Sequence, residues 1–306
     1  VVAAKTEVLT IELTEKMRGM DDPLTYKEIG DGTMPVVPMV EKNPFILMDN
    51  TMGEHRFSTD EVNRFSGGRN DPARLATSFA GVANSDDTRN DLIVRGASPL
   101  GLQWVLEGLP IQNPNHLGHI GTTSGFFPML NINTIETSDF RLGCFSAQYA
   151  NATTGIFDLH LRTGSQSESA YAAQISLNGG ELMMERPLFK KRGSMLVALR
   201  YSALRLFNLL PSIFRFNAET LPTTYDANFN LQYLSPKAGE FTLFGFYGNG
   251  SFQSQANASD LSNVFAFDPQ ADVHWQHQNG FVGLKHRYFF NENTFWQTTA
   301  GANIAY

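Results

Sequence analysis

The strongest constraint on the fold is a two-residue alternation of side chains in the second half of the chain. It is cleanest between residues 225 and 233, where aromatic or aliphatic residues alternate with polar ones. Successive side chains of a β-strand point to opposite faces of the sheet, so this pattern predicts a strand with one apolar and one polar face. The apolar set is Tyr225, Ala227, Phe229, Leu231 and Tyr233, and the polar set is Asp226, Asn228, Asn230 and Gln232.

The same alternation predicts six antiparallel strands within residues 163–306. Short turns are expected at 190–193, 236–239 and 290–293, and long loops at 203–224 and 249–272. Short turns at one end, long loops at the other and strands of about 9–11 residues are typical of a barrel that crosses a membrane. A soluble antiparallel sheet also alternates polar and apolar residues, and alternation alone favours neither. Aromatic residues flank the apolar centres, as in interfacial girdles: Tyr171, Tyr225, Tyr233, Trp296 and Tyr306.

Composition removes several classes of protein. The net charge of −7 argues against a nucleic-acid binder, which normally carries a basic patch. The single cysteine, Cys144, excludes an intrachain disulfide framework and a Cys-rich zinc site. No stretch of about 18 apolar residues occurs, so a membrane role would have to come from strands rather than helices.

Residues 54–162 predict a compact α+β domain. Ser58 is placed to cap a helix that begins near Thr59, and Asp71-Pro72 starts a second helix. Strands are expected at 91–95, 103–107 and 156–162. Before this domain, residues 1–18 predict one strand of an upstream β-domain, and the proline-containing residues 19–53 predict an extended linker.

Three blocks in the middle region resemble the plug domain of TonB-dependent outer-membrane receptors. They are Arg89-Asn90-Asp91-Leu92-Ile93-Val94-Arg95-Gly96, then Leu106-Glu107-Gly108-Leu109-Pro110-Ile111, then Ser138-Asp139-Phe140 through Tyr149-Ala150-Asn151 and Gly155-Ile156-Phe157-Asp158-Leu159. The likeness is closest to the Bacteroidetes type, in which a carboxypeptidase-regulatory-like domain precedes the plug. The motif residues that it singles out are Arg95, Gly96, Glu107, Gly108, Tyr149 and Gly155.

The chain departs from the family at two motif positions. Leu142-Gly143 stands where the family usually has Arg-Gly, and Tyr149-Ala150 where it has Tyr-Gly. The helix of the sugar-importing members is replaced by residues 73–79, which weakens the expectation of a lipoprotein lid.

The resemblance implies a plug at 54–162 and, at 163–306, the first six strands of an outer-membrane barrel that totals about 22. The strands run on to Tyr306, so the expectation is a piece of a longer barrel. The resemblance also implies a periplasmic partner, TonB with ExbB and ExbD, that binds a segment before the plug by strand addition. The candidate contacts are Val36, Val37, Met39 and Val40, and a plain linker is the competing interpretation.

The remaining polar residues suggest little chemistry. His116 and His119 have a spacing that could chelate a metal, but Pro114 and Gly118 argue against a helix there, so a solvated loop is expected. His274 and His277 are expected on opposite faces of one strand. No catalytic residue, metal site or cofactor is predicted. Arg95 and Glu107 either lie in solvent or meet buried charges of the barrel.

Three functions follow, and the sequence leaves them open. The first is energised import of an unidentified solute across the bacterial outer membrane, with the plug closing the lumen and lipids and a possible surface lipoprotein as further partners. The second is a plugged barrel that serves as a structural or assembly subunit of a larger complex. The third is a soluble carbohydrate-binding β protein.

Overall fold

The computed structural model describes residues 53–68, 70–84, 89–118, 123–176, 179–203, 222–254, 273–291 and 294–305. They belong to one compact unit, Thr51–Tyr306. The strand predicted in 1–18 lies outside the described residues, as do the candidate TonB contacts Val36, Val37, Met39 and Val40. None of the helices in the described part of the chain is long and apolar enough to span a membrane.

The α+β domain is built on a five-stranded sheet in the order β1-β8-β9-β4-β5. Strand β4 runs parallel to β9, and the other neighbours are antiparallel. The sheet strands are β1 (Glu54–Ser58), β4 (Leu102–Leu106), β5 (Leu109–Ile111), β8 (Ile135–Arg141) and β9 (Gly155–Leu161). Two ribbons and four short helices complete the described part of the domain: β2 (Val82–Ala83) with β3 (Ile93–Val94), β6 (Asn115–His116) with β7 (Phe127–Pro128), α1 (Thr59–Arg64), α2 (Pro72–Ala76), η2 (Pro99–Gly101) and η3 (Ile132–Thr134).

Both predicted helix starts are confirmed. Ser58 and Glu61 form a reciprocal capping box, in which the Glu61 carboxylate accepts from the Ser58 N–H at 2.7 Å. Asp71 caps α2 by accepting from the Ala73 N–H at 2.9 Å. Such caps supply partners to backbone N–H groups that the first helical turn leaves without one. Helix α2 nevertheless ends at Ala76, so the apolar residues that follow it pack from a loop.

The strand predictions for this domain are partly confirmed. The strands expected at 103–107 and 156–162 correspond to β4 and β9. The strand expected at 91–95 is present only as the two residues of β3. Strands β1 and β8 were not predicted. Strand β8 is buried along most of its length and has charged residues on one buried face, so it lacks the alternation that marks a half-exposed strand.

The core of the α+β domain is built around aromatic rings of the sheet, and Val62 of α1 and Ala73 and Ala76 of α2 belong to the same buried cluster. Phe157 lies 4.8 Å from Trp104 and 5.1 Å from Phe140, measured between ring centroids. Phe57 of β1 packs edge-on against the same ring, at 5.9 Å. The rings therefore connect four of the five strands through direct side-chain contacts.

The second sheet has seven antiparallel strands in sequence order, with β10 and β16 at its edges. They are β10 (Ala170–Ser176), β11 (Gly179–Leu188), β12 (Gly193–Ala203), β13 (Thr223–Ser235), β14 (Gly239–Ser254), β15 (Val273–Asn291) and β16 (Thr294–Ala305). The predicted count of six is wrong because β11 was missed. Its methionines fall on both faces and Pro187 lies within it, which hides the alternation.

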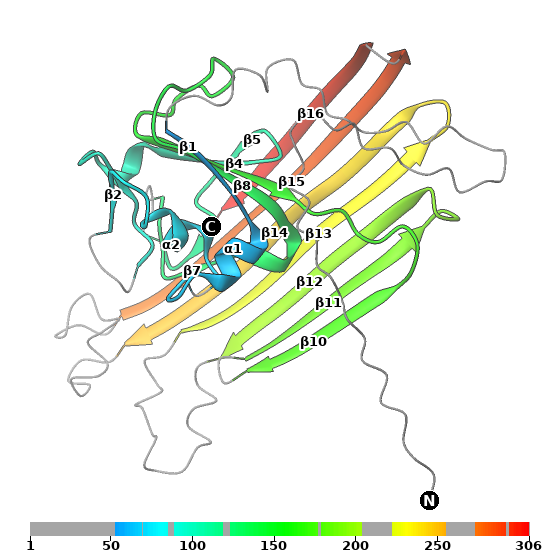
Figure 1. Cartoon of the computed structure of the whole chain (residues 1–306). Coiled ribbons are helices and arrows are strands. Elements are labelled where there is room, and N and C mark those ends of the chain that lie inside the picture. Colours follow the sequence, from blue (N-terminus) through cyan, green and yellow to red (C-terminus); the bar gives the residue numbers. More distant parts are fainter. Residues whose placement is uncertain are drawn as a thin grey trace, which may run out of the picture. The chain divides into compact units, whose positions relative to one another are not determined.

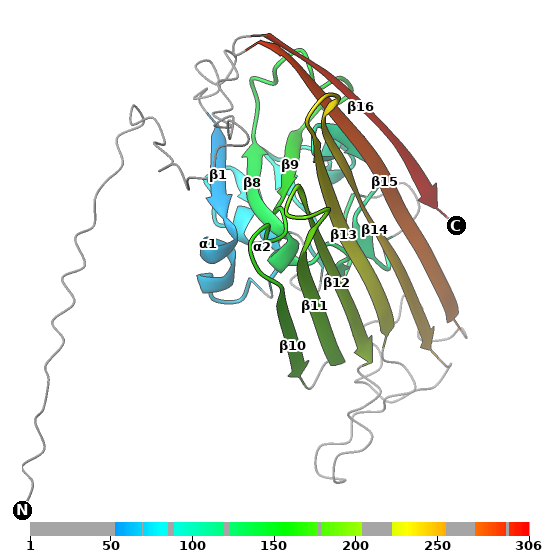
Figure 2. The ribbon, with the colours of Figure 1, turned by 90° about the vertical axis from the view of Figure 1, so that its right-hand side faces the viewer.

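The α+β domain lies against one face of this long sheet, whose strands extend beyond it (Figure 1). Figure 2 shows β1, β8 and β9 on one side of the arching strands β11 to β16. Phe244 and Phe246 of β14 and Phe281 of β15 belong to the same buried apolar cluster as Leu106 and Met129 of the domain. The two layers therefore share part of one core.

Candidate functional site

The exposed face of the long sheet is apolar, whereas its covered face is polar on β13 and carries phenylalanines on β14 and β15. On β13 the side chains of Asp226, Asn228 and Asn230 are at most 4% exposed and face the α+β domain, whereas Tyr225 on the opposite face is 44% exposed. A soluble sheet buries its apolar face, so this arrangement is inverted. Water-soluble packing does not account for it, but a lipid environment on the outer side does.

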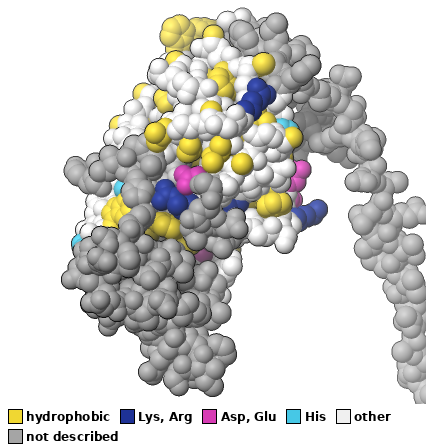
Figure 3. Space-filling view, turned by 90° about the vertical axis from the view of Figure 1, so that its left-hand side faces the viewer, with side chains coloured by type: hydrophobic (Ala, Val, Ile, Leu, Met, Phe, Trp, Pro, Cys, Tyr) yellow, Lys and Arg dark blue, Asp and Glu magenta, His cyan; other side chains and the backbone are white. Residues whose placement is uncertain are grey.

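The exposed face carries large apolar side chains along its whole width. It includes Tyr171, Ile175, Leu182, Leu199, Tyr201, Tyr225, Leu243, Tyr247, Val282, Leu284, Trp296 and Ile304. A patch of this extent exceeds what monomeric soluble proteins expose. The left-hand face of Figure 1 differs: Figure 3 shows hydrophobic side chains there in separate spots, with acidic and basic ones side by side, over the part made of described residues.

A buried charge cluster joins the domain to strands β12 and β13. The carboxylate of Asp226 contacts the His116 Nε2 and accepts from the Arg200 Nε at 2.7 Å. The Arg200 guanidinium also donates to the Pro128 carbonyl oxygen of β7. His116 is fully buried, so the prediction of a solvated loop is wrong at this residue, whereas His119 lies outside the described residues.

Amide side chains of the long sheet bind the backbone of the domain. Asn228 donates to the Met129 carbonyl oxygen at 3.2 Å, and its own oxygen accepts from the Asn131 N–H at 3.3 Å. Asn230 donates to the Arg162 carbonyl oxygen at 3.1 Å. These bonds supply partners to loop backbone groups that would otherwise be buried without one.

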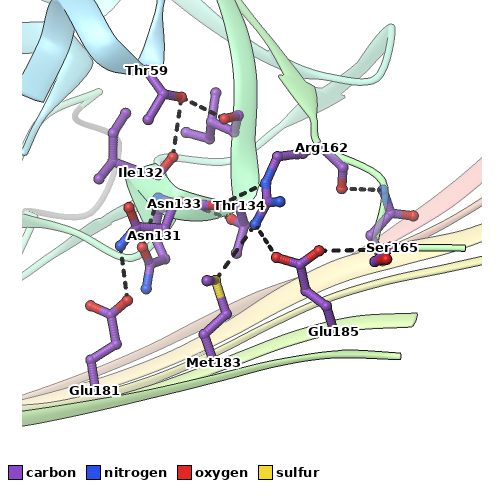
Figure 4. A network of polar contacts seen from close by, with 12 residues as sticks. Thr59, Asn131, Ile132, Asn133, Thr134, Arg162, Ser165, Glu181, Met183 and Glu185 are labelled. Carbon is purple, nitrogen blue, oxygen red and sulfur yellow. Dashed lines mark hydrogen bonds and ion pairs between the residues drawn. The ribbon is translucent and has the colours of Figure 1, made fainter. Parts of the chain in front are cut away.

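A second ion pair lies where the domain leads into the long sheet (Figure 4). Arg162 donates to the Glu185 carboxylate of β11 at 2.7 Å, and the Ser165 N–H donates to the same carboxylate at 3.1 Å. Asn133 of η3 donates to Glu181 at 3.0 Å. Strand β11, which the sequence pattern missed, thus supplies two of the acidic contacts.

The Glu107 side chain connects the turn after β4 to strands β9 and β15. Glu107 and Gly108 have φ values of +53° and +82° and form the tight turn between β4 and β5, where glycine tolerates the left-handed conformation best. One Glu107 oxygen accepts from the Leu161 N–H at 2.7 Å and the other forms an ion pair with Lys285 of β15. The Glu107 side chain therefore contacts a charge of the long sheet instead of lying free in solvent.

Arg95 and Gly96 occupy a different kind of position. They form the turn after β3 with φ values of +51° and +75°, and the Arg95 N–H donates to the Gly81 carbonyl oxygen at 2.7 Å. The Arg95 side chain is exposed. Among the described residues, the Arg95 side chain therefore lies in solvent and does not meet a buried charge of the long sheet.

Tyr149 and Gly155 lie inside the domain rather than at the interface. The Tyr149 hydroxyl donates to Asp158 at 2.7 Å, and the Arg141 guanidinium lies 4.8 Å from the centre of its ring. Burial raises the pKa of Tyr149, and the Asp158 charge adds to the effect. A Cβ on Gly155 would lie 3.0 Å from the Leu102 Cδ1 and 3.3 Å from the Arg141 carbonyl oxygen, so a larger residue would fit only if these neighbours shifted slightly.

The described residues hold no cluster of three or more His, Cys, Asp or Glu side chains that could bind a metal. His274 is exposed and His277 is half-buried on β15.

Solved structures resemble this chain, although no protein-family model and no curated protein matches its sequence. The ferric enterobactin receptor PfeA of Pseudomonas aeruginosa, as a G324V mutant, matches with a TM-score of 0.55 at 13% identity over 85% of this chain. The siderophore receptor PirA of Acinetobacter baumannii matches with a TM-score of 0.55 at 14% identity over 84%. The alcaligin outer-membrane receptor FauA of Bordetella pertussis matches with a TM-score of 0.50 at 12% identity over 84%.

The described part of the chain has the fold of TonB-dependent receptors. The predicted fold class, a plug followed by antiparallel barrel strands, is thereby confirmed, and the matched proteins are receptors rather than enzymes. The chain spans 41% of PfeA and 40% of PirA and FauA. The regulatory-like domain and the Bacteroidetes type remain predictions.

The plug sheet carries a row of charges across β1, β8 and β9. Arg56 donates to the Asp139 carboxylate at 2.6 and 2.7 Å, and His160 lies 3.4 Å from the same carboxylate. Burial disfavours the charged forms, but for Asp139 the hydrogen bonds from Arg56 and His160 outweigh it and lower the pKa. For His160, burial alone would lower the pKa. The hydrogen bond to Asp139 and the nearby carboxylates outweigh this effect and raise the pKa of His160 to about 9.

These shifts predict a pH dependence of plug stability. The His160 contribution is fully present below its unfolded pKa of 6.5 and is lost as the pH rises through about 9. The Asp139 contribution is fully present above its unfolded pKa of 3.8 and is lost as the pH falls from there through the lower pKa of the folded state. The plug should therefore resist urea better at pH 6 than at pH 10, and His160→Gln should reduce this difference. Urea titration of plug proteolysis at the two pH values measures it, and an unchanged difference in His160→Gln would contradict the assignment.

Proposed function

We propose that this chain forms the plug and the first barrel strands of an outer-membrane receptor that imports a solute with energy supplied through TonB. The observation that carries the proposal is the arrangement of the long sheet: its exposed face is apolar, and the face that holds the plug buries the polar side chains of β13. Likeness to PfeA, PirA and FauA supports it at the level of the fold. The outer membrane is the compartment that this arrangement suits.

The contacts between plug and barrel suit a plug that must move. Apart from two shared apolar clusters and the buried contacts of Asp226, they are single hydrogen bonds and a few ion pairs, such as Arg162–Glu185 and Glu107–Lys285. Each neutral hydrogen bond contributes about 0.5–1.5 kcal/mol net, because water replaces the lost partner. If water enters the lumen as the plug moves, it forms new hydrogen bonds with the separated groups, which offsets much of the free-energy cost of breaking the contacts. A scaffold subunit has no need of such an interface.

TonB would bind the segment before the plug by strand addition, and Val36, Val37, Met39 and Val40 are the candidate residues. ExbB, ExbD and a surface lipoprotein are further proposed partners. Backbone hydrogen bonds dominate strand addition, so the prolines at 35 and 38 limit the pairing to the donors that remain.

Deleting residues 31–44 tests the coupling to TonB. The full-length receptor in detergent should bind the purified C-terminal domain of TonB, and the deletion variant should not, while its level in the outer membrane stays unchanged. Equal binding by both proteins would move the contact elsewhere in the chain. Absence of binding by the intact receptor would overturn TonB-coupled import and favour the assembly subunit.

A soluble carbohydrate-binding protein is disfavoured by the same geometry. Its apolar face would have to be buried, whereas side chains such as Ile175, at 93% exposure, lie open. Aggregation without detergent is the expected behaviour, and refolding to a monomer in plain buffer would support the soluble alternative.

A further inference from the structure

Exposed cations of the barrel gather at the end of the sheet that has the short turns. Lys190, Lys191 and Arg192 form the turn between β11 and β12, and Lys237 lies in the turn between β13 and β14. Figure 1 shows both turns at the same end of the sheet, and the Leu234 N–H donates to the Arg192 carbonyl oxygen at 2.7 Å. Arg186, exposed near the end of β11, completes the group, which we call the basic rim.

The basic rim has no acidic partner in the described part of the chain. Two nearby carboxylates are engaged elsewhere, since Glu185 accepts from Arg162 and Glu240 accepts from Gln232. Glu168 is the exposed carboxylate described close to this end. At the opposite end, the described barrel cation is Arg200, which points inward to Asp226. Unpaired positive charge on the barrel is thus confined to one end of the described strands.

Aromatic side chains accompany these cations. Phe189, in the same turn as Lys190, is 60% exposed, and Trp296 on the outer face of β16 is 62% exposed. Aromatic residues at the border of an apolar band mark the depth of the lipid headgroups. The rim therefore places five cations at headgroup depth, where phosphate is the complementary charge.

We propose that the basic rim binds the phosphates of anionic phospholipids in the periplasmic leaflet. The inference rests on the proposed function, because it needs the apolar face to lie in a membrane. The short-turn end faces the periplasm in outer-membrane barrels, so the leaflet follows from the geometry of the turns. The negatively charged lipids of that leaflet supply the charge that the rim lacks within the chain.

Native mass spectrometry of the full-length protein in detergent tests the proposal, with cardiolipin and phosphatidylcholine as probes. The wild type should bind cardiolipin at least tenfold more tightly than phosphatidylcholine. A variant with Lys190→Gln, Lys191→Gln, Arg192→Gln and Lys237→Gln should lose most of that preference. Arg64→Gln, which removes an exposed cation of plug helix α1, should keep it.

Three outcomes would overturn the proposal: no preference in the wild type, an undiminished preference in the rim variant, or a rim-dependent preference for lipid A over cardiolipin. The last would place the rim in the other leaflet. Failure of the proposed function is distinguishable, since a protein that stays monomeric without detergent would refute the membrane placement itself.

Discussion

Replacing Asp226 by alanine should weaken the docking of the plug by about 3 kcal/mol. The carboxylate holds both His116 and Arg200, and its removal leaves two polar groups at the interface without a charged partner. Breaking a buried ion pair by removing one partner costs about 3–5 kcal/mol. The lower end applies because the Arg200 side chain keeps 24% exposure and regains some water.

The urea concentration at which trypsin begins to cut the plug, in detergent-solubilised protein, measures this loss. Ala227→Ser is the matched control, because residue 227 is next in the chain but points to the outer face. It should leave plug cleavage unchanged. Equal cleavage of Asp226→Ala and wild type would show that the charge cluster does not hold the plug.

Val282→Arg should impair membrane insertion by about 2–4 kcal/mol, the cost of a lipid-facing arginine near the middle of a bilayer. Val282 lies near the centre of β15 and is 41% exposed on the outer face. On a soluble sheet an exposed substitution of this kind would change stability by about 0.5 kcal/mol or less. The two accounts therefore differ by several-fold in the expected effect.

Folding titrations in lipid vesicles, with urea as denaturant, give the free energy of insertion for each variant. Ala172→Arg is the control, since residue 172 lies on the inner face of β10 and is exposed there. It should insert nearly as well as the wild type. If Val282→Arg inserts like Ala172→Arg, the outer face is not in contact with lipid.

Much of the fold could be predicted because its signals are local. The alternation at 225–233 is strict, and the structure separates its two residue sets onto opposite faces. The caps of α1 and α2 depend on residues within three positions of each helix start. Strands β8 and β11 were missed for the opposite reason: burial on both faces in one and methionines on both faces in the other remove the local pattern.

The interface could be predicted only in part. The motif pointed to Glu107 and left its partner open, and the partner, Lys285, lies 178 positions away in the sequence. Asp226 belonged to a recognised polar face, but nothing local shows that His116, 110 positions earlier, would contact it. Such contacts depend on how the plug packs against the long sheet, so they cannot be predicted from the periodicity of a strand or the spacing of a motif.

Spin labels placed one at a time along residues 226–232, in a Cys144→Ser background, test the central claim most directly in reconstituted membranes. Positions 227, 229 and 231 should be relaxed strongly by oxygen, which concentrates in lipid, and weakly by a water-soluble nickel chelate. Labels at 228 and 230, which face the plug, should be poorly accessible to both. Strong relaxation by the nickel chelate at 227, 229 and 231 would place this face in water and contradict the barrel.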